Sequence, residues 1–145
     1  MIKVAVSGAL GKMGREVINA VNNCADTTLV AAIDICNVGK HIGELVLNEK
    51  NGVIISDNAE VALKNSNADV VVDFTQPATI FENAKKYLNI GVAPVIGTTG
   101  LKPEQIEELE NLLKEKNVSC LIAPNFSTGA VLMMKFAKEA AKYFD

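Results

Sequence analysis

Three glycines near the start of the chain, Gly8, Gly11 and Gly14, stand at intervals of three residues and carry the clearest chemical signal in the sequence. They follow an apolar run and precede apolar residues at helical spacing. In such a strand-to-helix turn, glycines permit a sharp bend and let a pyrophosphate approach bare backbone N–H groups. The positive end of the helix dipole, together with Lys12 and Arg15, would attract phosphate further. The stretch therefore predicts the phosphate-binding turn of a dinucleotide-binding fold.

The glycine spacing alone leaves a second interpretation open, a tight turn that binds nothing, because it reads G-x-x-G-x-x-G and not the commoner G-x-G-x-x-G. Asp34 strengthens the binding interpretation. It ends the next apolar run, where a dinucleotide-binding fold places the acid that accepts hydrogen bonds from the adenosine ribose hydroxyls. Taken by itself, the residue could also be a solvated aspartate at a strand end.

The residues after Asp34 bear on the choice of cofactor. Ile35 and Cys36 are uncharged, and no lysine or arginine occurs between Asp34 and Lys40. The ribose phosphate of NADP would be repelled by a carboxylate about 4 Å away by up to ~4 kcal/mol at an effective dielectric constant of about 20. We therefore expect NADH to be preferred, with NADPH as a second cofactor that the chain could accept.

Three later segments place candidate contact residues at strand ends. The run in residues 69–75 ends with Phe74 and Thr75. The next run leads into Gly-Thr-Thr-Gly at residues 97–100, whose backbone N–H groups and hydroxyls could cradle an anion or an amide. The last run leads into a loop at residues 123–127. Open α/β sheets bind ligands at the carboxyl ends of their strands, so we expect these segments beside the glycine turn.

Six apolar runs with the length of strands alternate with stretches of helical periodicity. The expected strands are residues 2–6, 28–34, 53–55, 69–75, 93–96 and 119–122. The alternation predicts a single α/β domain, a Rossmann-type doubly wound parallel sheet of about six strands in the order 3-2-1-4-5-6. The last helix is expected from about Gly129 towards Phe144. It is apolar around much of its circumference and needs further protein to cover it.

The composition, 49% hydrophobic and 21% charged residues in a chain of 145, fits a globular protein of one domain. A net charge of −3 argues against nucleic acid or an anionic membrane as the main partner. No apolar run approaches the roughly 20 residues of a membrane span, and Met1 begins no evident signal peptide. Cys24, Cys36 and Cys120 form no C-x-x-C pair, so we expect free, buried thiols in a cytoplasmic protein. The one histidine, His41, lies among glycines, and we assign it neither to catalysis nor to a metal.

Four segments together resemble a known family. They are GALGKMGR at residues 8–15, DFTQP at 73–77, GTTG at 97–100 and APNFSTG at 123–129. In this order and at these distances they resemble dihydrodipicolinate reductase, an enzyme of the lysine and diaminopimelate pathway, over nearly all of the chain. The glycine segment is common to many dehydrogenases, whereas GTTG followed by APNFS is far more specific.

The resemblance implies hydride transfer from NADH or NADPH to a cyclic, unsaturated dicarboxylate, giving tetrahydrodipicolinate, in an enzyme that is commonly a homotetramer. It implies that Asp34 binds the adenosine ribose, that Phe74 lines the cofactor crevice and that Thr99 lies closest to the substrate. The implied pyrophosphate contacts are Gly8, Ala9, Leu10, Gly11, Lys12 and Met13. The implied contacts on the nicotinamide side are Gly97, Thr98, Thr99, Ala123, Pro124, Asn125 and Phe126.

The resemblance also shows what these residues lack. The family's substrate domain follows the segment that corresponds to residues 130–145 and carries a His-His-x-x-x-Lys type motif that binds the dicarboxylate and supplies a proton. No such motif occurs here, and His41 lies in the wrong segment to replace it. Reduction needs a proton donor as well as a hydride source. We therefore expect a dinucleotide-binding domain in residues 1–128, a helix in 129–145 that leads towards an absent substrate domain, and no catalytic residue or activity in this chain alone.

Two other functions stay open on the sequence. An NAD-dependent oxidoreductase of the aspartate or homoserine dehydrogenase type could begin in the same way, although GTTG and APNFS count against it. A stand-alone NAD-binding module could instead use its apolar last helix to dock on a partner protein. Failure to bind any dinucleotide would favour a third, structural interpretation.

Overall fold

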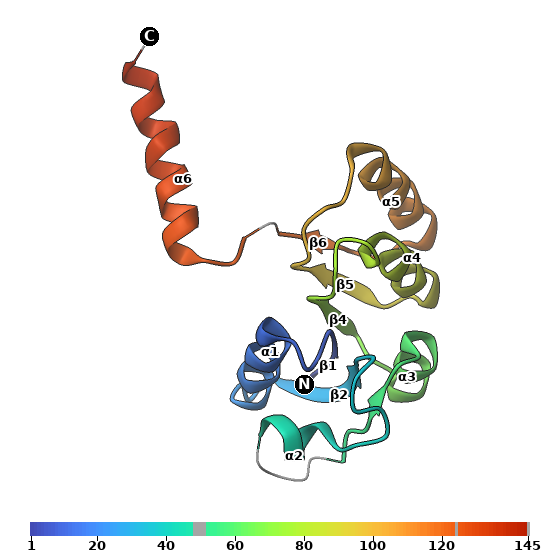
Figure 1. The fold of residues 1–145 in the computed structure, drawn as a ribbon. Helices are drawn as coiled ribbons and strands as arrows, with labels where there is room; N and C mark the ends of the chain where they lie inside the picture. The colour runs from blue at the N-terminus through green and yellow to red at the C-terminus, as the bar shows by residue number, and fades with distance from the viewer. Residues whose placement is uncertain (48–51, 124, 145) are drawn as a thin grey trace.

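The computed structural model describes residues 1–47, 52–123 and 125–144, and Figure 1 shows one sheet with helices on both of its faces. The strands are β1 (Ile2–Ser7), β2 (Thr27–Ile33), β3 (Ile55–Ser56), β4 (Val70–Asp73), β5 (Ala93–Ile96) and β6 (Leu121–Ile122). The helices are α1 (Lys12–Asn22), α2 (Ile42–Val46), α3 (Ala59–Ser66), α4 (Ile80–Ile90), α5 (Pro103–Lys116), α6 (Thr128–Ala140) and the 3-10 helix η1 (Ala141–Tyr143).

The strand order is β3-β2-β1-β4-β5-β6, and each strand pair of this sheet is parallel. The Rossmann-type, doubly wound fold predicted from the sequence is therefore confirmed, including its strand order. The order reverses between β1 and β4, where Ser7 and Asp73 are partners at the carboxyl ends of the two strands. The loops that follow these strands consequently diverge at the switch point where sheets of this kind bind ligands.

Side chains of β1 alternate between two cores because helices cover both faces of the sheet. Val4 and Val6 pack in one cluster with Ile18 of α1. Ala5 packs in a second cluster with Leu63 of α3. In Figure 1, α1 and α2 accordingly cover one face, whereas α3, α4 and α5 cover the other.

The turn between β1 and α1 depends on two glycines. Gly8 has a φ of 75°, in the left-handed region that favours glycine. Gly14 is buried in the first turn of α1, and a Cβ atom there would overlap the carbonyl oxygen of Gly8. The missing side chain thus lets the helix lie directly against the turn, as the sequence predicted for a dinucleotide-binding fold.

Helix ends mostly follow the sequence signals, whereas some strand bounds do not. The side chain of Asn58 accepts a hydrogen bond from the Val61 N–H and begins α3, as expected of a capping residue. The third strand was expected at residues 53–55 but lies at Ile55–Ser56, because Ile54 forms an antiparallel bridge with His41. The last helix runs as α6 to Ala140 and tightens into η1, which ends at Tyr143, so the chain is helical towards Phe144 as expected.

The expectation of buried cysteines is wrong for two of the three. Cys24 follows Asn23, which already caps α1, so the helical period that placed Cys24 in the core no longer applies, and the residue is exposed. Cys36 is exposed in the loop after β2. Cys120 is half-buried before β6, and burial raises the pKa of its thiol to about 11.

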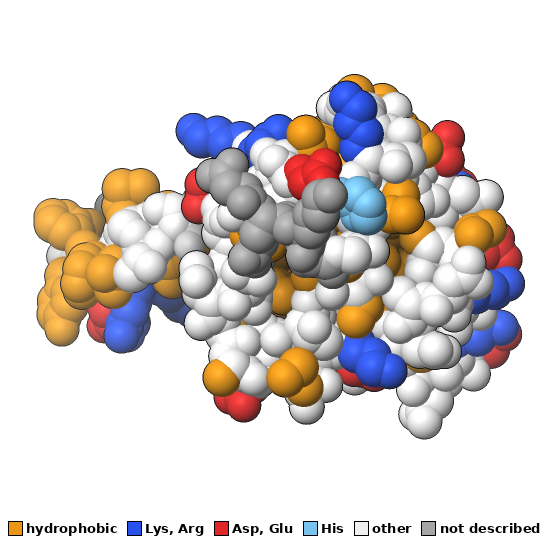
Figure 2. All heavy atoms as spheres, turned by 90° about the horizontal axis from the view of Figure 1, so that it is seen from below, with side chains coloured by type: hydrophobic (Ala, Val, Ile, Leu, Met, Phe, Trp, Pro, Cys, Tyr) orange, Lys and Arg blue, Asp and Glu red, His pale blue; other side chains and the backbone are white. Residues whose placement is uncertain are grey.

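Helix α6 stands away from the sheet at the end of an extended segment (Figure 1). None of its described side chains is buried, and large apolar ones are open to solvent, among them Leu132, Met133 and Phe136. Figure 2 shows these apolar side chains gathered on the part of the molecule that projects to the left. The expectation of an apolar helix that lacks a cover is therefore confirmed. Within the described ranges, no helix combines the length and apolar character needed to cross a bilayer.

Gly14→Ala is expected to destabilise the fold by about 1–3 kcal/mol, the usual cost of forcing extra atoms into a packed site. The added Cβ must displace the Gly8 carbonyl and with it the start of α1. Urea unfolding measures the change in free energy. Gly129→Ala is the matched control, because the nearest atom to a Cβ there is Ser127 Oγ at 3.9 Å. Equal unfolding free energies for the two variants would contradict the close packing of α1.

Candidate dinucleotide-binding site

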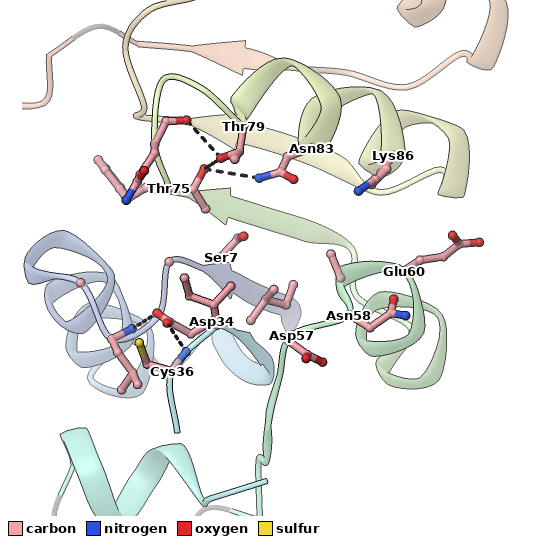
Figure 3. Close-up of a pocket in the computed structure, with 18 residues that line it drawn as sticks. Ser7, Asp34, Cys36, Asp57, Asn58, Glu60, Thr75, Thr79, Asn83 and Lys86 are labelled. Carbon is pink, nitrogen blue, oxygen red and sulfur yellow. Dashed lines mark hydrogen bonds between the residues drawn. The ribbon is translucent and has the colours of Figure 1, made fainter. Parts of the chain in front are cut away.

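A cleft of about 970 Å³ opens at the carboxyl ends of the central strands (Figure 3). The glycine turn, the loop after β2, the loop after β4 and one side of α4 line it. Six of the residues predicted from the sequence are part of this lining: Gly8, Leu10, Gly11, Asp34, Phe74 and Thr75. The structure therefore brings the proposed pyrophosphate turn and the proposed ribose acid into one cleft.

A smaller cleft of about 320 Å³ adjoins the first, because Phe74 and Thr75 line both. Its lining includes five further residues predicted from the sequence: Lys12, Met13, Gly97, Thr98 and Thr99. Together, the two clefts form a continuous surface from the loop after β2 to the loop after β5, along which an extended dinucleotide could lie.

The Asp34 side chain connects the glycine turn to the loop after β2 through hydrogen bonds. Its Oδ2 atom accepts a hydrogen bond from the Leu10 N–H at 2.9 Å, and its Oδ1 atom accepts one from the Cys36 N–H at 3.0 Å (Figure 3). An ionised carboxylate offers about four acceptor positions, so both oxygens retain capacity for ribose hydroxyls. The same side chain can therefore shape the turn and bind a ligand.

The start of α1 is arranged for an anion. Gly11 occupies the N-cap position without a side-chain cap, and the first turn contains no acidic residue. Arg15 is held in place by two backbone carbonyls, which are neutral, so its positive charge remains close to the turn. Its guanidinium donates to the Leu10 carbonyl at 3.0 Å and to the Leu45 carbonyl at 2.8 Å, which ties the glycine turn to α2.

The ring of Phe74 lies at the boundary of the two clefts, and that of Phe126 packs beside it outside both linings. The ring of Phe74 lies so close to the Gly97 backbone that a Cβ at Gly97 would overlap it. The ring of Phe126, which follows β6, lies 5.7 Å from that of Phe74 at an angle of 58°. These contacts bring the segments after β4, β5 and β6 together, although Phe126 itself is 49% exposed.

The remaining predicted residues lie at the edge of the site or beneath it. Ala9 is fully buried, and its N–H donates to the Ile33 carbonyl. Ala123 and Asn125 belong to the loop after β6 and line neither cleft. Pro124 lies outside the described residues.

Sequence reasoning missed a buried polar network below the site, centred on the fully buried Asp73. The Oδ1 atom of Asp73 accepts from the Thr75 N–H at 2.8 Å, the Thr75 hydroxyl at 2.7 Å and the Thr98 hydroxyl at 3.0 Å. Its Oδ2 atom accepts from the Tyr87 hydroxyl at 2.7 Å, and that hydroxyl also lies 2.9 Å from Ser7 Oγ. A charged residue inside an otherwise apolar strand was the signal that could have revealed this network.

Tyr87 keeps its proton within this network. Burial raises the pKa of Tyr87 far above its ordinary value, and the neighbouring Asp73 carboxylate raises it further. Because the carboxylate only accepts, Tyr87 donates to Asp73 and can itself accept from the Ser7 hydroxyl.

The sequence reading also missed the polar side of α4 that borders the larger cleft. Thr79, Asn83 and Lys86 stand there at helical spacing, and Figure 3 shows them along the edge of the site. Glu60 in the first turn of α3 and Asp57 just before that helix line the same cleft. The larger cleft is thus lined by three acidic side chains, Asp34, Asp57 and Glu60, with Lys86 as the cation among its described lining residues.

His41 and the acidic side chains supply no metal centre in the described part of the chain, where no group of three metal-ligand residues occurs. His41 is half-buried near α2, away from both clefts.

The fold and the glycine-turn site define an α/β domain of the Rossmann type with the arrangement of a dinucleotide-binding protein. Residues 2–126 match the family model described as dihydrodipicolinate reductase, N-terminus. The chain therefore belongs to the dihydrodipicolinate reductase family. This finding confirms the resemblance and disfavours the aspartate or homoserine dehydrogenase alternative.

Individual relatives agree with the family assignment. The 4-hydroxy-tetrahydrodipicolinate reductase of Desulfitobacterium hafniense is 50% identical over 144 residues, which cover 99% of this chain and 54% of that protein. That of Syntrophomonas wolfei is 48% identical over 142 residues, 98% of this chain and 53% of that protein. The solved structure of dipicolinate-bound dihydrodipicolinate reductase from Paenisporosarcina sp. TG-14 matches with a TM-score of 0.84 at 40% identity, over 99% of this chain and 55% of that chain. The chain thus spans about half the length of these relatives.

The free energy of unfolding is expected to fall less steeply at alkaline pH in Tyr87→Phe than in the unaltered protein. The raised pKa of Tyr87 means that its contribution is complete below about pH 10, the ordinary tyrosine value. Above that pH only the unfolded chain releases the proton, so the unaltered protein should lose about 1.4 kcal/mol more per pH unit than the variant.

Urea unfolding from neutral pH to about pH 11 measures this difference. Tyr143→Phe is the matched control, because that side chain is exposed and should leave the alkaline slope unchanged. Parallel curves for the unaltered protein and Tyr87→Phe would contradict a buried, protonated Tyr87.

Proposed function

We propose that this chain binds NADH in the two adjoining clefts and forms the cofactor-binding half of a 4-hydroxy-tetrahydrodipicolinate reductase. The observation that carries the proposal is the hydrogen bond from the Leu10 N–H to Asp34, which joins the glycine turn to the ribose acid in one cleft. A pyrophosphate at the start of α1 and an adenosine ribose at Asp34 would then be neighbours, as they are in a dinucleotide.

The preference for NADH rests on the charges around Asp34. Its carboxylate would face the ribose 2′ position, and Ile35 and Cys36 beside it carry no charge. Lys86 is the cation of the larger cleft among its described lining residues, and it stands on α4 across from Asp34 (Figure 3). The phosphate of NADPH would thus meet a carboxylate with no adjacent lysine or arginine, although NADPH could still bind more weakly.

The nicotinamide is proposed to lie in the smaller cleft, with Thr99 facing the substrate. The lining by Phe74, Gly97 and Thr98 offers a ring, bare backbone and a hydroxyl to a flat amide-bearing ring. The cofactor supplies the hydride, and the proposed acceptor is a cyclic, unsaturated dicarboxylate of the dihydrodipicolinate type. The Paenisporosarcina relative binds dipicolinate, a flat cyclic dicarboxylate, which supports this substrate class.

The proton for the reduction and the groups that bind the dicarboxylate are proposed to come from residues outside these 145. The chain contains one histidine, His41, and it lines neither cleft. The exposed apolar side chains of α6 support an extension of the fold beyond this helix, because such a surface is normally covered by protein. We further propose that the full-length protein is a homotetramer in the cytoplasm, where the free cysteines of the described residues would remain reduced.

Asp34→Asn is expected to weaken NADH binding by at least about tenfold, because the ribose would lose hydrogen bonds to a charged acceptor. Both carboxylate oxygens also accept backbone N–H groups, so an amide places N–H against N–H at one of them. Titration with NADH and NADPH measures the dissociation constants. Asp26→Asn, at the other end of β2, is the matched control. Tighter binding of NADPH than NADH by the unaltered chain would refute the cofactor preference.

The 145-residue chain alone is expected to bind NADH without measurable turnover. Its clefts offer a place for the hydride donor but no histidine as the acid. The assay follows oxidation of NADH with the dihydrodipicolinate-type substrate, and a full-length relative such as the Desulfitobacterium hafniense enzyme serves as the positive control. Substrate-dependent oxidation of NADH by the 145 residues alone would show that the acid lies within them.

A further inference from the structure

Asp73 is a buried carboxylate that has no assigned role in the proposed binding of the cofactor. It is fully buried at the end of β4, and in the part of the chain that the structure describes no lysine or arginine is paired with it. Burying an unpaired carboxylate is costly unless several hydrogen bonds compensate for the loss of water. A protein that only needed a stable strand here could use valine, so the donors around Asp73 are the evidence for its role.

The protons in this network can be assigned from the chemistry of the groups. A carboxylate has no proton to give, so the hydroxyls of Thr75 and Thr98 must both donate to Oδ1 of Asp73. The Thr75 N–H donates to the same oxygen and fixes which side of the carboxylate faces the clefts. Tyr87 donates to Oδ2 on the opposite side.

This assignment determines what the two threonines can offer to a ligand. Both line the smaller cleft, and their protons point away from it towards Asp73. The Thr75 oxygen already accepts from the Asn83 amide at 3.4 Å and lies 3.5 Å from the Thr79 hydroxyl, so its acceptor positions are used within the protein. The Thr98 oxygen, whose hydrogen bonds among the described residues go only to Asp73, keeps its lone pairs for a ligand and acts as an acceptor. Without Asp73, the Thr98 hydroxyl could rotate and present a proton or a lone pair without preference.

We propose that Asp73 is a positioning residue that turns the Thr98 hydroxyl into a hydrogen-bond acceptor for the nicotinamide half of the cofactor, while Thr75 completes the hydrogen bonds that hold the Asp73 carboxylate. The carboxamide NH₂ group and the ribose hydroxyls of that half are donors, which matches such a surface. This inference rests on the proposed binding of NADH. It identifies the groups that form hydrogen bonds with the nicotinamide half of the cofactor.

The two oxygens of the Asp73 carboxylate contact different parts of the structure, so a role in ligand binding can be distinguished from support of the fold. On the Oδ2 side, Tyr87 connects Asp73 to Ser7, next to the glycine turn. On the Oδ1 side, the contacts lead to the threonines at the nicotinamide end. Changes on the two sides should therefore affect ligand binding differently.

The test compares NADH with ADP-ribose, which has the same adenosine and pyrophosphate but no nicotinamide. Asp73→Asn removes the charge and one of the two acceptor oxygens, so the threonine protons are held less firmly. We expect the dissociation constant of NADH to rise about tenfold, the effect of losing roughly one hydrogen bond, while that of ADP-ribose changes less than about twofold. Tyr87→Phe, which alters only the Oδ2 side, should lower the thermal midpoint and keep the ratio of the two constants.

Asp69→Asn is the matched control, since Asp69 lies at the other end of β4 and its carboxylate accepts only the Lys3 N–H among the described contacts, at 2.8 Å. It should leave both dissociation constants unchanged. An equal loss for NADH and ADP-ribose in Asp73→Asn, or no loss for NADH, would overturn the positioning role while leaving cofactor binding intact. Failure of the unaltered chain to bind either ligand would instead refute the proposed function, and the inference with it.

A second variant keeps the test decisive if Asp73→Asn does not fold. Thr98→Val conserves the branched shape and removes the hydroxyl that Asp73 holds. It should give the same selective loss of NADH affinity with ADP-ribose binding retained. Unchanged NADH binding in a folded Thr98→Val protein would overturn the proposal regardless of the first variant.

Discussion

The close approach of α1 to the end of β1 is the constraint on which the rest of the site depends. Gly14 has no side chain to hold the helix away from the Gly8 carbonyl, so the first turn of α1 lies directly on the loop that leaves the sheet. This placement presents the Leu10 N–H to Asp34 and brings Arg15 within reach of the Leu10 carbonyl. A helix displaced by one methyl group would break both contacts, and the cleft would lose its shape.

Much of the fold could be predicted because local signals and the global pattern agree in this chain. Alternating apolar runs and helical periods determine a parallel sheet, and the glycine turn places β1 at its centre. Asp34 was predicted for the same reason, since its position after β2 brings it beside the turn. Residues that lie at the carboxyl ends of neighbouring parallel strands meet whatever their separation in sequence, which is why the Gly97–Thr99 segment could also be placed.

What could not be predicted depends on contacts between side chains of distant elements. Asp73 and Tyr87 looked like parts of a strand and of a helix stripe, and only the packing of α4 on the sheet brings the phenol to the carboxylate. Cys24 was misplaced because the period of α1 was extended past the residue that ends it. The contact of Phe126 with Phe74 similarly needs the path of the chain after β6, which no local pattern specifies.

The distribution of charge indicates how an anionic cofactor could be held by a chain of net negative charge. Asp34, Asp57 and Glu60 line the larger cleft with Lys86 as the cation among its described lining residues, so the side chains of that cleft carry a net negative charge. The attraction then comes from backbone N–H groups at the start of α1, where the helix dipole adds about 0.3–1 kcal/mol, and from the positive charges of Lys12 and Arg15 in the same turn. Backbone donors hold any pyrophosphate equally well, so discrimination falls to the two ends of the dinucleotide. Asp34 can accept hydrogen bonds from a ribose that carries no phosphate at one end, and Thr98, oriented by Asp73, can accept one from the nicotinamide half at the other.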